Sequence, residues 1–515
     1  MNANDHTPRS TTSSTVTPTR RDALRALSAL GLAGLSLHAR AAADAEPGAW
    51  RRIYAPLDGS IEAGLHGRLE TASIPIEGKL PAGLQGTLYR TGPARFKLGS
   101  TQYTHWFDGD GMVQAFRLQD GRASHRGQLL RTPKLIEEEA AGRFVYPGYG
   151  TAIPGTHSPR GADAVNTGNI NLLAMNNGRE LYTLWEGGSA LQIDPDTLAT
   201  MGFKAWSPET AGAPFSAHPR RAPDGTVWSF GYASGSGKLI IYEIAADGRL
   251  KRQTVLAAPQ ADMVHDFAIT ENHLVFLLMP IKLKDGAAPM GSLDRFEWKS
   301  DAPLIAWVVR KADFAVKRFE LPNGGVFHIG NAWEEGGVLR LGYARYTRFL
   351  EHLHALDVTQ PANTPDKLAH WVEVELNLAQ GTARQIDTSL GSVEFPSFDA
   401  RHTGLRTDTT VLMQRRGSAG MLAVQGMDTV LALRGERMQH FRYGAGWLAE
   451  EHVFVPRAWA TAEGDGWIIG TAYDTGSART SLSVFEAARL AEGPVARMTL
   501  PYGLPLGLHG QFVAA

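Results

Sequence analysis

The sequence predicts an all-β fold, and more specifically a seven-bladed β-propeller. The 56 glycines and 28 prolines make up about 16% of the 515 residues, against roughly 12% in average usage, which favours many tight turns over long helices. A hairpin pattern also recurs along the chain: an alternating strand, a turn containing Asp, Gly or Pro, and a second strand. Because 515 residues exceed the usual size of one compact domain, a repeat architecture fits the length as well.

The recurring hairpin sets the number of blades. Seven copies begin about 50 to 80 residues apart, a period with room for several short strands in each unit. Four-stranded sheets packed radially around a central channel fit such a period. The copies begin at Met112, Leu191, Leu239, Leu304, Trp371, Thr429 and Leu482. Because divergent copies are identified by pattern alone, six or eight blades are the alternatives.

Residues 1–43 are predicted to be an export signal with a disordered N-terminus. Thr19-Arg20-Arg21-Asp22-Ala23-Leu24 precedes an apolar run from Ala26 to Leu37 and the small-residue segment Ala39-Arg40-Ala41. The run is too short to span a bilayer, and paired arginines ahead of it are typical of a twin-arginine signal. We therefore expect residues 44–515 to form a single propeller catalytic domain that is exported, to a bacterial periplasm. A disordered tail leading into an amphipathic helix is the alternative.

The composition excludes several classes of site and partner. The chain has no cysteine, which rules out disulfides, Cys-ligated zinc, iron–sulfur clusters and a Cys nucleophile. Fifty-one basic and fifty-two acidic residues give a net charge of −1, so nucleic acid is not an expected partner. No GxSxG, HExxH or EF-hand motif is present, and the run Glu137-Glu138-Glu139 is interpreted as a solvated stretch. A metal would have to bind His, Asp or Glu.

Four histidines share one position within the repeat. The spacings from the hairpin start are about 27, 26, 24 and 27 residues for His218, His265, His328 and His509. For Glu394 and Glu451 the spacings are about 23 and 22 residues. In a propeller one fixed phase means one fixed radius, and the chain returns to the axis as the innermost strand just after an outer hairpin. We therefore expect six side chains to converge on the axis: His218, His265, His328, His509, Glu394 and Glu451. His452, next to Glu451, should face the other way because strand side chains alternate.

This set of residue types favours iron. Four neutral imidazoles suit Fe(II), Zn, Cu or Ni and disfavour Mg, Ca and Mn. Catalytic zinc normally takes three protein ligands plus water, so four histidines with open positions fit a six-coordinate ion such as Fe(II) better. A metal-bound His needs an acceptor at its other ring nitrogen, which Glu394 and Glu451 can supply. The alternative is that these histidines are ordinary surface or core residues, as most single histidines are.

Ordered motifs from about residue 75 to the C-terminus add a family resemblance. They are Gly86-Thr87-Leu88-Tyr89-Arg90-Thr91-Gly92-Pro93, His105-Trp106-Phe107-Asp108-Gly109-Asp110-Gly111-Met112, Leu184-Trp185-Glu186-Gly187-Gly188, Ser216-Ala217-His218-Pro219, Met263-Val264-His265-Asp266-Phe267, Phe327-His328, Glu394-Phe395-Pro396, Val453-Phe454-Val455-Pro456-Arg457 and Leu508-His509-Gly510. On these motifs the chain resembles the carotenoid cleavage oxygenases, non-haem iron enzymes that split a conjugated carbon–carbon double bond with O2 into two carbonyl products.

The resemblance implies a seven-bladed propeller with a cap of helices and loops that forms a substrate tunnel over the metal. It implies one Fe(II) per chain and O2 as the co-substrate, with cleavage of a carotenoid or apocarotenoid as the expected reaction. The implied iron ligands are His218, His265, His328 and His509, supported from behind by Glu186, Glu394 and Glu451. Glu186 is assigned through the resemblance alone.

Two departures from the family pattern bear on the substrate. Ile170 is the closest match to a Thr that many members carry near the vacant iron position, and Trp185 stands where members that cleave stilbene-like phenolics tend to have Lys. The second departure favours an apolar polyene. The alternatives are the same oxidative cleavage of a stilbene or phenylpropenoid, and a non-catalytic exported propeller that binds a ligand or protein. The family also includes an isomerase that binds iron without cleaving.

The expected partner is an apolar conjugated small molecule. The apolar segments Leu277–Pro280 and Ala287–Met290 are candidates for an entrance in peripheral contact with a membrane, with ordinary packing as the alternative. The sequence makes no prediction of oligomeric state.

Overall fold

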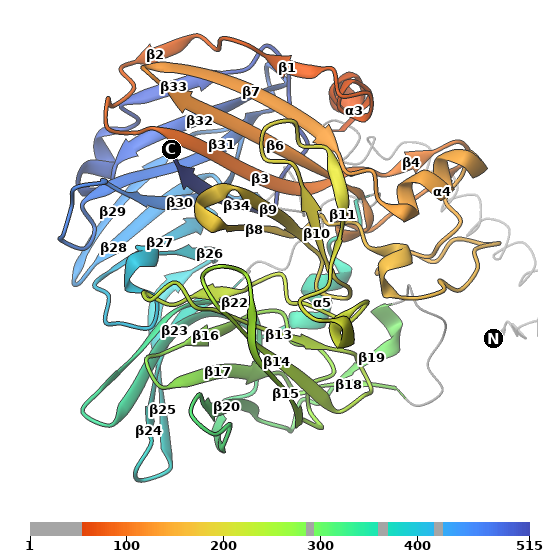
Figure 1. The fold of residues 1–515 in the computed structure, drawn as a ribbon. Coiled ribbons are helices and arrows are strands. Elements are labelled where there is room, and N and C mark those ends of the chain that lie inside the picture. Colours follow the sequence, from red (N-terminus) through yellow and green to blue (C-terminus); the bar gives the residue numbers. More distant parts are fainter. Residues whose placement is uncertain (1–53, 285–292, 359–368, 417–425) are drawn as a thin grey trace, which may run out of the picture. The chain divides into compact units, whose positions relative to one another are not determined.

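The computed structural model describes residues 54–284, 293–358, 369–416 and 426–515. Seven antiparallel sheets follow one another along the chain as the blades of a propeller (Figure 1). The predictions of an all-β fold and of seven blades are confirmed. The predicted export signal, residues 1–43, lies outside the described residues. The boundary at residue 43 therefore stays a prediction.

The strands of each blade are given in order from the axis outward. Blade 1 contains β34 (His509–Ala514), β3 (Gly86–Arg95), β6 (Asp110–Gln119), β7 (Arg122–Leu129) and β1 (Leu69–Thr71); blade 2 contains β8 (Asn171–Met175), β9 (Glu180–Leu184), β10 (Ala190–Ile193) and β11 (Thr200–Lys204); blade 3 contains β12 (Arg220–Arg221), β13 (Val227–Tyr232), β14 (Lys238–Ile244) and β15 (Leu250–Ala257). Blade 4 contains β16 (Phe267–Ile269), β17 (His273–Leu278), β20 (Leu304–Arg310) and β21 (Val316–Leu321); blade 5 contains β22 (Gly325–Glu335), β23 (Val338–Tyr346), β24 (His370–Asn377) and β25 (Thr382–Gly391). Blade 6 contains β26 (Val393–Ser397), β27 (Thr409–Gln414), β28 (Thr429–Arg434) and β29 (Arg437–Arg442); blade 7 contains β30 (Trp447–Pro456), β31 (Gly466–Asp474), β32 (Arg479–Glu486), β33 (Ala496–Thr499) and β2 (Ile76–Gly78).

The seven predicted hairpins form the outer strands of the seven blades. Each pairs antiparallel as expected, from β6 with β7 in blade 1 to β32 with β33 in blade 7. Outer strands such as β15 alternate between half-buried and exposed residues, whereas all ten residues of β3 are buried. This difference is the one expected where a strand inside the sheet is covered on both faces and an outer strand is half solvated.

The two ends of the described chain close the ring. The C-terminal strand β34 pairs with β3, from Thr91 opposite His509 to Gly86 opposite Ala514. Near the other end, strand β2 pairs with β33 at the rim of blade 7. Blade 1 is therefore built from both ends of the chain, which leaves no gap between blades 7 and 1 and places the C-terminal strand on the axis.

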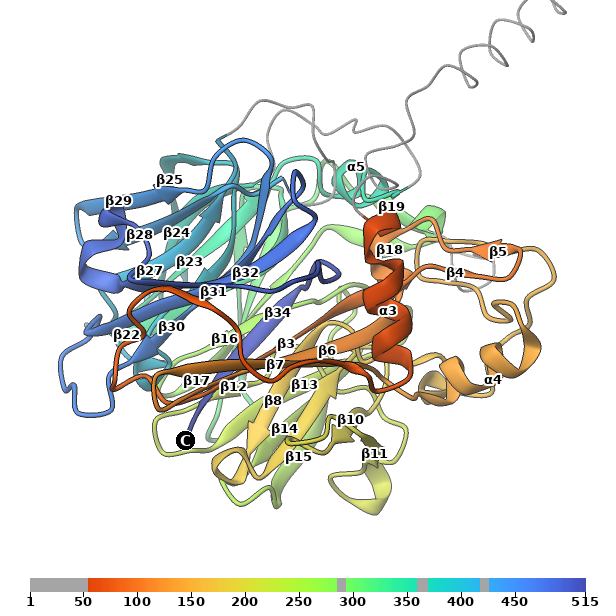
Figure 2. The same cartoon turned by 90° about the horizontal axis from the view of Figure 1, so that it is seen from above.

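Helices and two small sheets gather on one side of the propeller (Figure 2). They include α3 (Asp58–Leu65), α4 (Pro133–Ala141), α5 (Phe349–His354), the pair β4 (Lys97–Leu98) and β5 (Thr101–Gln102), and the pair β18 (Ile281–Leu283) and β19 (Phe296–Trp298). Short 3-10 helices are η1 (Ala55–Leu57), η2 (Trp106–Asp108), η3 (Ala162–Val165), η4 (Asn176–Gly178), η5 (Pro208–Thr210), η6 (Leu293–Arg295), η7 (Ala400–His402) and η8 (Ala487–Glu492). The helices α3, α4 and α5 and the two small sheets supply the predicted cap, whereas η4 and η8 pack against strands of the blades.

Helix α4 in the cap is bounded by recognisable capping residues and carries a buried glutamate. Its N-terminus is capped by Thr132, whose hydroxyl accepts from the Leu135 N–H, and Gly142 ends it in a left-handed conformation with φ 65°. The prediction that the run 137–139 is solvated is wrong for Glu138, which is fully buried and pairs with Lys134 at 2.7 Å. A helix turns successive side chains by about 100°, so one member of an acidic run can face inward.

The two segments considered for an entrance have different outcomes. Leu277–Pro280 is buried and contributes to the hydrophobic core at the end of β17, so ordinary packing is the correct interpretation there. Ala287–Met290 lies outside the described residues. Within the part of the chain that the structure describes, no helix is long and apolar enough to cross a membrane.

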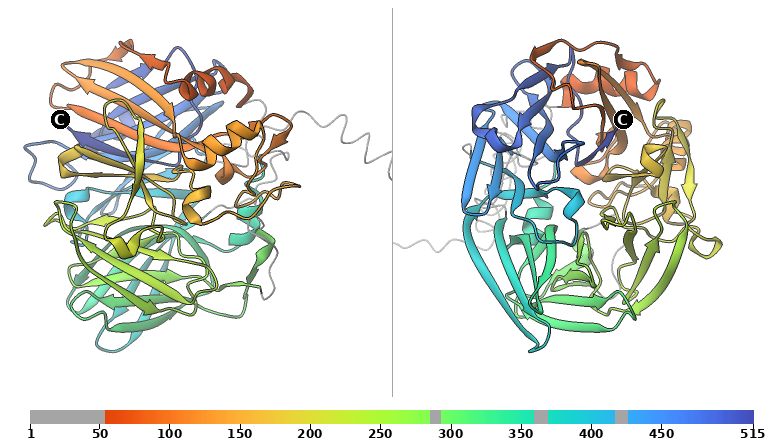
Figure 3. Two further views of the ribbon diagram at one scale, coloured as in Figure 1. Left: turned by 45° about the vertical axis from the view of Figure 1, so that its right-hand side comes forward. Right: turned by 60° about the vertical axis from the view of Figure 1, so that its left-hand side comes forward.

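The innermost strands surround the axis as the blades follow one another around the ring in chain order (Figure 3). Side chains carried at equal radius by different blades therefore meet there. The axis is where the predicted metal-binding residues should be found.

Candidate metal centre

Four histidines lie together at the axis. His218 and His265 lie two residues before the inner strands β12 and β16, and His328 and His509 belong to the inner strands β22 and β34. One ring nitrogen from each lies within 4.8 Å of the others. Three of the four are buried, and the side chain of His265 is 11% exposed. The structure thus brings together the histidines that the repeat phase placed at one radius.

Three of the imidazoles are held from behind by a glutamate. The distances from Nδ1 to the nearest carboxylate oxygen are 2.6 Å for His265 and Glu186, 2.5 Å for His328 and Glu394, and 3.0 Å for His509 and Glu451. These are the glutamates that the resemblance implied. Each contact orients its ring so that Nε2 faces the other histidines, as a carboxylate does behind a metal-bound imidazole. The backbone N–H of His218 instead donates to the Ser216 hydroxyl, at 2.9 Å.

These hydrogen bonds fix the position of the imidazole protons. An ionised carboxylate can only accept, so the Nδ1 atom that faces it carries the hydrogen and the Nε2 atom of a neutral ring keeps its lone pair. Nε2 of His265 lies 3.3 Å from Nε2 of His328 and 3.0 Å from Nε2 of His218. Lone pairs of His265 and His328 therefore face each other at close range and repel. A cation between them removes that repulsion, so the donor set fits a bound metal.

Burial favours the neutral imidazoles that bind metals. It lowers the pKa of His218 and His328 well below the usual range, and the neighbouring imidazoles lower both further. Burial also acts to lower the pKa of His265, but the adjacent Glu186 carboxylate raises it overall. Burial raises the pKa of Glu394 to about 7, against the hydrogen bonds that it accepts. Metal ligands must be deprotonated, so the lowered pKa values of His218 and His328 suit metal binding near neutral pH.

Two tyrosines support the glutamates, and the sequence analysis missed both. The Tyr346 hydroxyl donates to Oε1 of Glu394 at 2.8 Å, and the Tyr232 hydroxyl donates to Oε1 of Glu186 at 3.1 Å. Each tyrosine is the last residue of the second strand of its blade, β13 or β23. Tyr346 lies farther from the following hairpin because a cap segment containing α5 is inserted there, so the shared position is not visible as a constant spacing.

A buried ion pair ties three inner strands together beside the histidines. Arg220 contacts the Asp266 carboxylate at 2.7 Å and donates to the Ile329 carbonyl at 2.8 Å. The Ile329 N–H in turn donates to Asp266 at 2.8 Å. Each residue follows a histidine by one or two positions, so this network holds the backbones of three histidines in one register. The motif that contains His265 already included Asp266, but its partner could not be identified without the fold.

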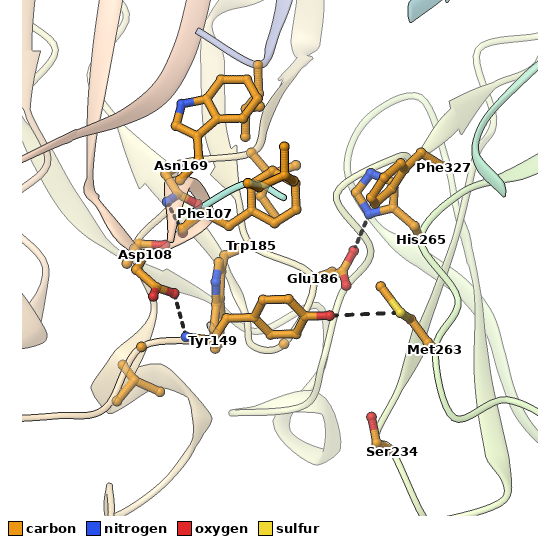
Figure 4. Close-up of a pocket in the computed structure, with 18 of the residues that line it drawn as sticks. Phe107, Asp108, Tyr149, Asn169, Trp185, Glu186, Ser234, Met263, His265 and Phe327 are labelled. Carbon is orange, nitrogen blue, oxygen red and sulfur yellow. Dashed lines mark hydrogen bonds and ion pairs between the residues drawn. The ribbon is translucent and has the colours of Figure 1, made fainter. Parts of the chain in front are cut away.

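A cavity of about 580 Å³ opens against the metal centre, within the range of small-molecule sites. His265, His328 and His509 line it, and most of the other lining residues are apolar or aromatic. In Figure 4, Glu186 points toward His265 and the Tyr149 hydroxyl points toward the sulfur of Met263, 3.8 Å away. Lining residues that enclose the space include Trp106, Phe107, Ile170, Trp185, Phe327 and Leu508.

Ile170 and Trp185, the two departures noted in the sequence, both face this cavity. Ile170 directly precedes the inner strand β8 of blade 2, so it brings an aliphatic side chain to the cavity wall. Trp185 follows β9 and precedes Glu186. Neither side chain brings a charge to the cavity.

The chain matches a known family in sequence and in fold. A sequence model of the family described as retinal pigment epithelial membrane protein matches residues 65–514, most of the chain. The chain belongs to this family. The resemblance to the carotenoid cleavage oxygenases is thereby confirmed.

The names of similar proteins give different substrates. The apocarotenoid-15,15'-oxygenase of Synechocystis sp. is 30% identical over 457 residues, covering 83% of this chain and 90% of that protein. The resveratrol cleavage oxygenase 1 of Aspergillus fumigatus is 28% identical over 470 residues, covering 83% of this chain and 89% of that protein. The crystal structure of cobalt-substituted Synechocystis apocarotenoid oxygenase matches with a TM-score of 0.78 at 27% identity, over 91% of this chain and 98% of that chain.

Proposed function

We propose that this protein is an Fe(II)-dependent dioxygenase that cleaves a conjugated carbon–carbon double bond of a carotenoid or apocarotenoid with O2 into two carbonyl products. The observation that carries the proposal is the set of imidazole nitrogens converging within 4.8 Å at the end of a largely apolar cavity. Membership of a family with an apocarotenoid oxygenase among the similar proteins supports the reaction class.

In this proposal His218, His265, His328 and His509 hold one iron ion per chain. Four imidazoles suit Fe(II) and leave ligand positions open. Glu186, Glu394 and Glu451 keep three of the rings in the metal-binding tautomer and offset the charge of the cation. Bound iron supplies the redox chemistry with O2 that side chains alone lack.

The remaining residues bind and position the substrate. The aromatic walls around Phe107, Trp185 and Phe327 suit a flat conjugated chain, and the volume of about 580 Å³ accommodates a drug-sized or larger ligand. Ile170 excludes water on the side of blade 2 because it offers no hydrogen-bond partner. The protein's contribution is position, desolvation and electrostatics, and no side chain is needed as a general acid or base.

The same cleavage of a stilbene or phenylpropenoid is the second candidate. The similarity to a resveratrol cleavage oxygenase favours it. The indole of Trp185 favours the polyene, because it lines the cavity without offering a phenol oxygen a cation. Aerobic incubation of iron-loaded protein with a mixed panel of polyenes and stilbenes, followed by mass spectrometry of the aldehydes, distinguishes the two.

Metal analysis of anaerobically purified protein tests the catalytic proposal against a non-catalytic binding propeller. We expect iron near one per chain and aldehydes from at least one conjugated substrate. Protein that holds no iron and cleaves nothing in the panel contradicts the proposal. An all-trans substrate returned as a geometric isomer, with no aldehyde formed, indicates isomerisation instead.

We also propose that the chain is exported through a twin-arginine signal and that the mature protein contacts membranes peripherally to obtain its substrate. The paired Arg20 and Arg21 before the apolar run support export. Cell fractionation with N-terminal sequencing tests it: a periplasmic product that begins after about residue 43 is expected, and an intact cytoplasmic chain contradicts it. Sedimentation with lipid vesicles tests the membrane contact, and protein that stays in the supernatant contradicts it.

A further inference from the structure

Besides histidines, five acidic or basic residues line the cavity next to the metal centre, and four of them have partners in the described structure. Asp108 accepts from the N–H groups of Tyr149 at 2.5 Å and Gly150 at 3.1 Å and from the Thr151 hydroxyl at 2.5 Å. Lys134 pairs with Asp110 at 2.8 Å and Glu138 at 2.7 Å. Glu186 and Glu394 are bound by histidines and tyrosines.

Arg295 is the exception. Its side chain makes no ion pair or hydrogen bond with any of the described residues, and its Nε–H is buried without an acceptor among them. Arg295 is half-buried at the end of η6 in the cap, between β18 and β19, and lines the cavity. The preceding Asp294 faces outward, with its side chain 85% exposed and a carboxylate oxygen 4.0 Å from Nε2 of His354.

A guanidinium in this position favours an anionic ligand. Arginine stays charged in proteins, and a charge beside an apolar cavity is unfavourable unless a counter-charge is present. The planar guanidinium matches a carboxylate with two parallel hydrogen bonds.

We propose that Arg295 is a specificity-determining residue that binds a carboxylate at the end of a conjugated polyene substrate. The inference rests on the proposed function, because it assumes that the polyene occupies this cavity with a double bond beside the histidines. Arg295 belongs to the cap and the histidines to the blades, so the carboxylate end and the reacting bond are bound by different elements. Anchoring one end sets which double bond lies at the metal centre.

Binding measured on metal-free protein tests this without relying on turnover. Trp106 and Trp185 line the cavity, so quenching of tryptophan fluorescence reports occupancy. The ligands are a polyene carboxylic acid and its methyl ester with the same chain. We expect wild-type protein to bind the acid about 10- to 100-fold more tightly than the ester, the range for a hydrogen bond to a charged group.

Three variants assign the preference to Arg295. Arg295→Met should bind acid and ester equally, and Arg295→Lys should keep part of the preference because it keeps the charge but not the paired geometry. Lys284→Met is the matched control. Lys284 lies next to β18, is exposed and outside the cavity lining, and donates to the Asp294 carbonyl at 2.7 Å. It should keep the full preference.

The outcomes separate this inference from the proposed reaction. Equal affinity of wild-type protein for acid and ester overturns the inference, as does an equal loss of preference in the Lys284 and Arg295 variants. Iron-loaded protein that cleaves acid and ester with equal kcat/KM also contradicts the role of Arg295 but leaves the reaction standing. A preference for the acid without any cleavage supports Arg295 and contradicts the reaction. Thermal unfolding of each variant shows whether it is folded.

Discussion

Replacing Glu394 with glutamine tests how much one carboxylate behind a histidine contributes to the iron affinity of the metal centre. Glu394 is 3% exposed and accepts three hydrogen bonds: from His328 Nδ1 at 2.5 Å, from the Phe395 N–H at 2.7 Å and from the Tyr346 hydroxyl at 2.8 Å. The first two reach the same oxygen. A glutamine can place its amide oxygen at that position and its amide nitrogen toward Tyr346, whose hydroxyl can accept. The packing and the number of hydrogen bonds are then unchanged, and only the negative charge is lost.

The expected size of the effect follows from that geometry. Loss of an outer carboxylate behind a metal-bound histidine lowers metal affinity or activity about 10- to 100-fold, which corresponds to about 1.4–2.7 kcal/mol. Glu394→Ala should be more severe, because it leaves three buried donors without an acceptor at about 1–3 kcal/mol each. The alanine variant should therefore lose stability as well as iron, whereas the glutamine variant should lose iron affinity with little change in unfolding.

Anaerobic competition for Fe(II) against a chelator measures the affinity, and denaturant unfolding measures the stability. Glu243→Gln is the matched control, because Glu243 is also a buried carboxylate but pairs with Lys251 and Arg252 in blade 3. It should leave the iron affinity unchanged. The reasoning is refuted if Glu394→Gln binds iron and turns over substrate within twofold of the wild-type protein, or if the control loses as much affinity.

Other parts of the structure give independent predictions. His509→Ala should abolish stoichiometric iron binding in metal analysis, whereas His452→Ala should retain it, because His452 faces away from the centre and bonds to Tyr443; the reverse order contradicts the ligand assignment. Lys134→Met should cost about 3–5 kcal/mol in denaturant unfolding, because it leaves buried carboxylates without their counter-ion; a change under 1 kcal/mol contradicts this. Burial lowers the pKa of His125 to about 3 and of His452 to about 4. Because the unfolded chain protonates these histidines first, near pH 6.5, stability should fall as pH drops from about 6.5 toward 4, by up to roughly 3 kcal/mol for each. His125→Gln should flatten the measured dependence of unfolding on pH, and an unchanged slope contradicts the assignment.

The repeat in the sequence was enough to predict the fold because each blade presents the same outer hairpin. Turn chemistry and alternation survive in the hairpin sequences even where residues differ, so all seven were identifiable. The closure of the ring was not predicted. Strand β2 and strand β34 pair with partners hundreds of residues away, and nothing local in Ile76–Gly78 or His509–Ala514 specifies those partners.

The site was predictable to the extent that its residues share the radius of the inner strands. The four histidines, Glu394 and Glu451 obey that phase. Glu186 does not, because it lies in the turn between β9 and β10, and only the family resemblance found it. Tyr346 precedes one cap insertion and Arg295 lies within another, and the lengths of these insertions differ between blades, so no constant spacing marks the two residues. Their roles come from contacts, or from the lack of contacts, that only the folded chain reveals.

The central claim is that the four-histidine centre supports insertion of both atoms of O2 across a conjugated double bond. Its most direct test is cleavage of an apocarotenoid by iron-loaded protein under ¹⁸O2, with the aldehydes reduced at once to alcohols and weighed by mass spectrometry. The account predicts one labelled oxygen atom in each of the two products, and no products from His328→Ala. Label in only one product, or cleavage that persists in His328→Ala, contradicts it.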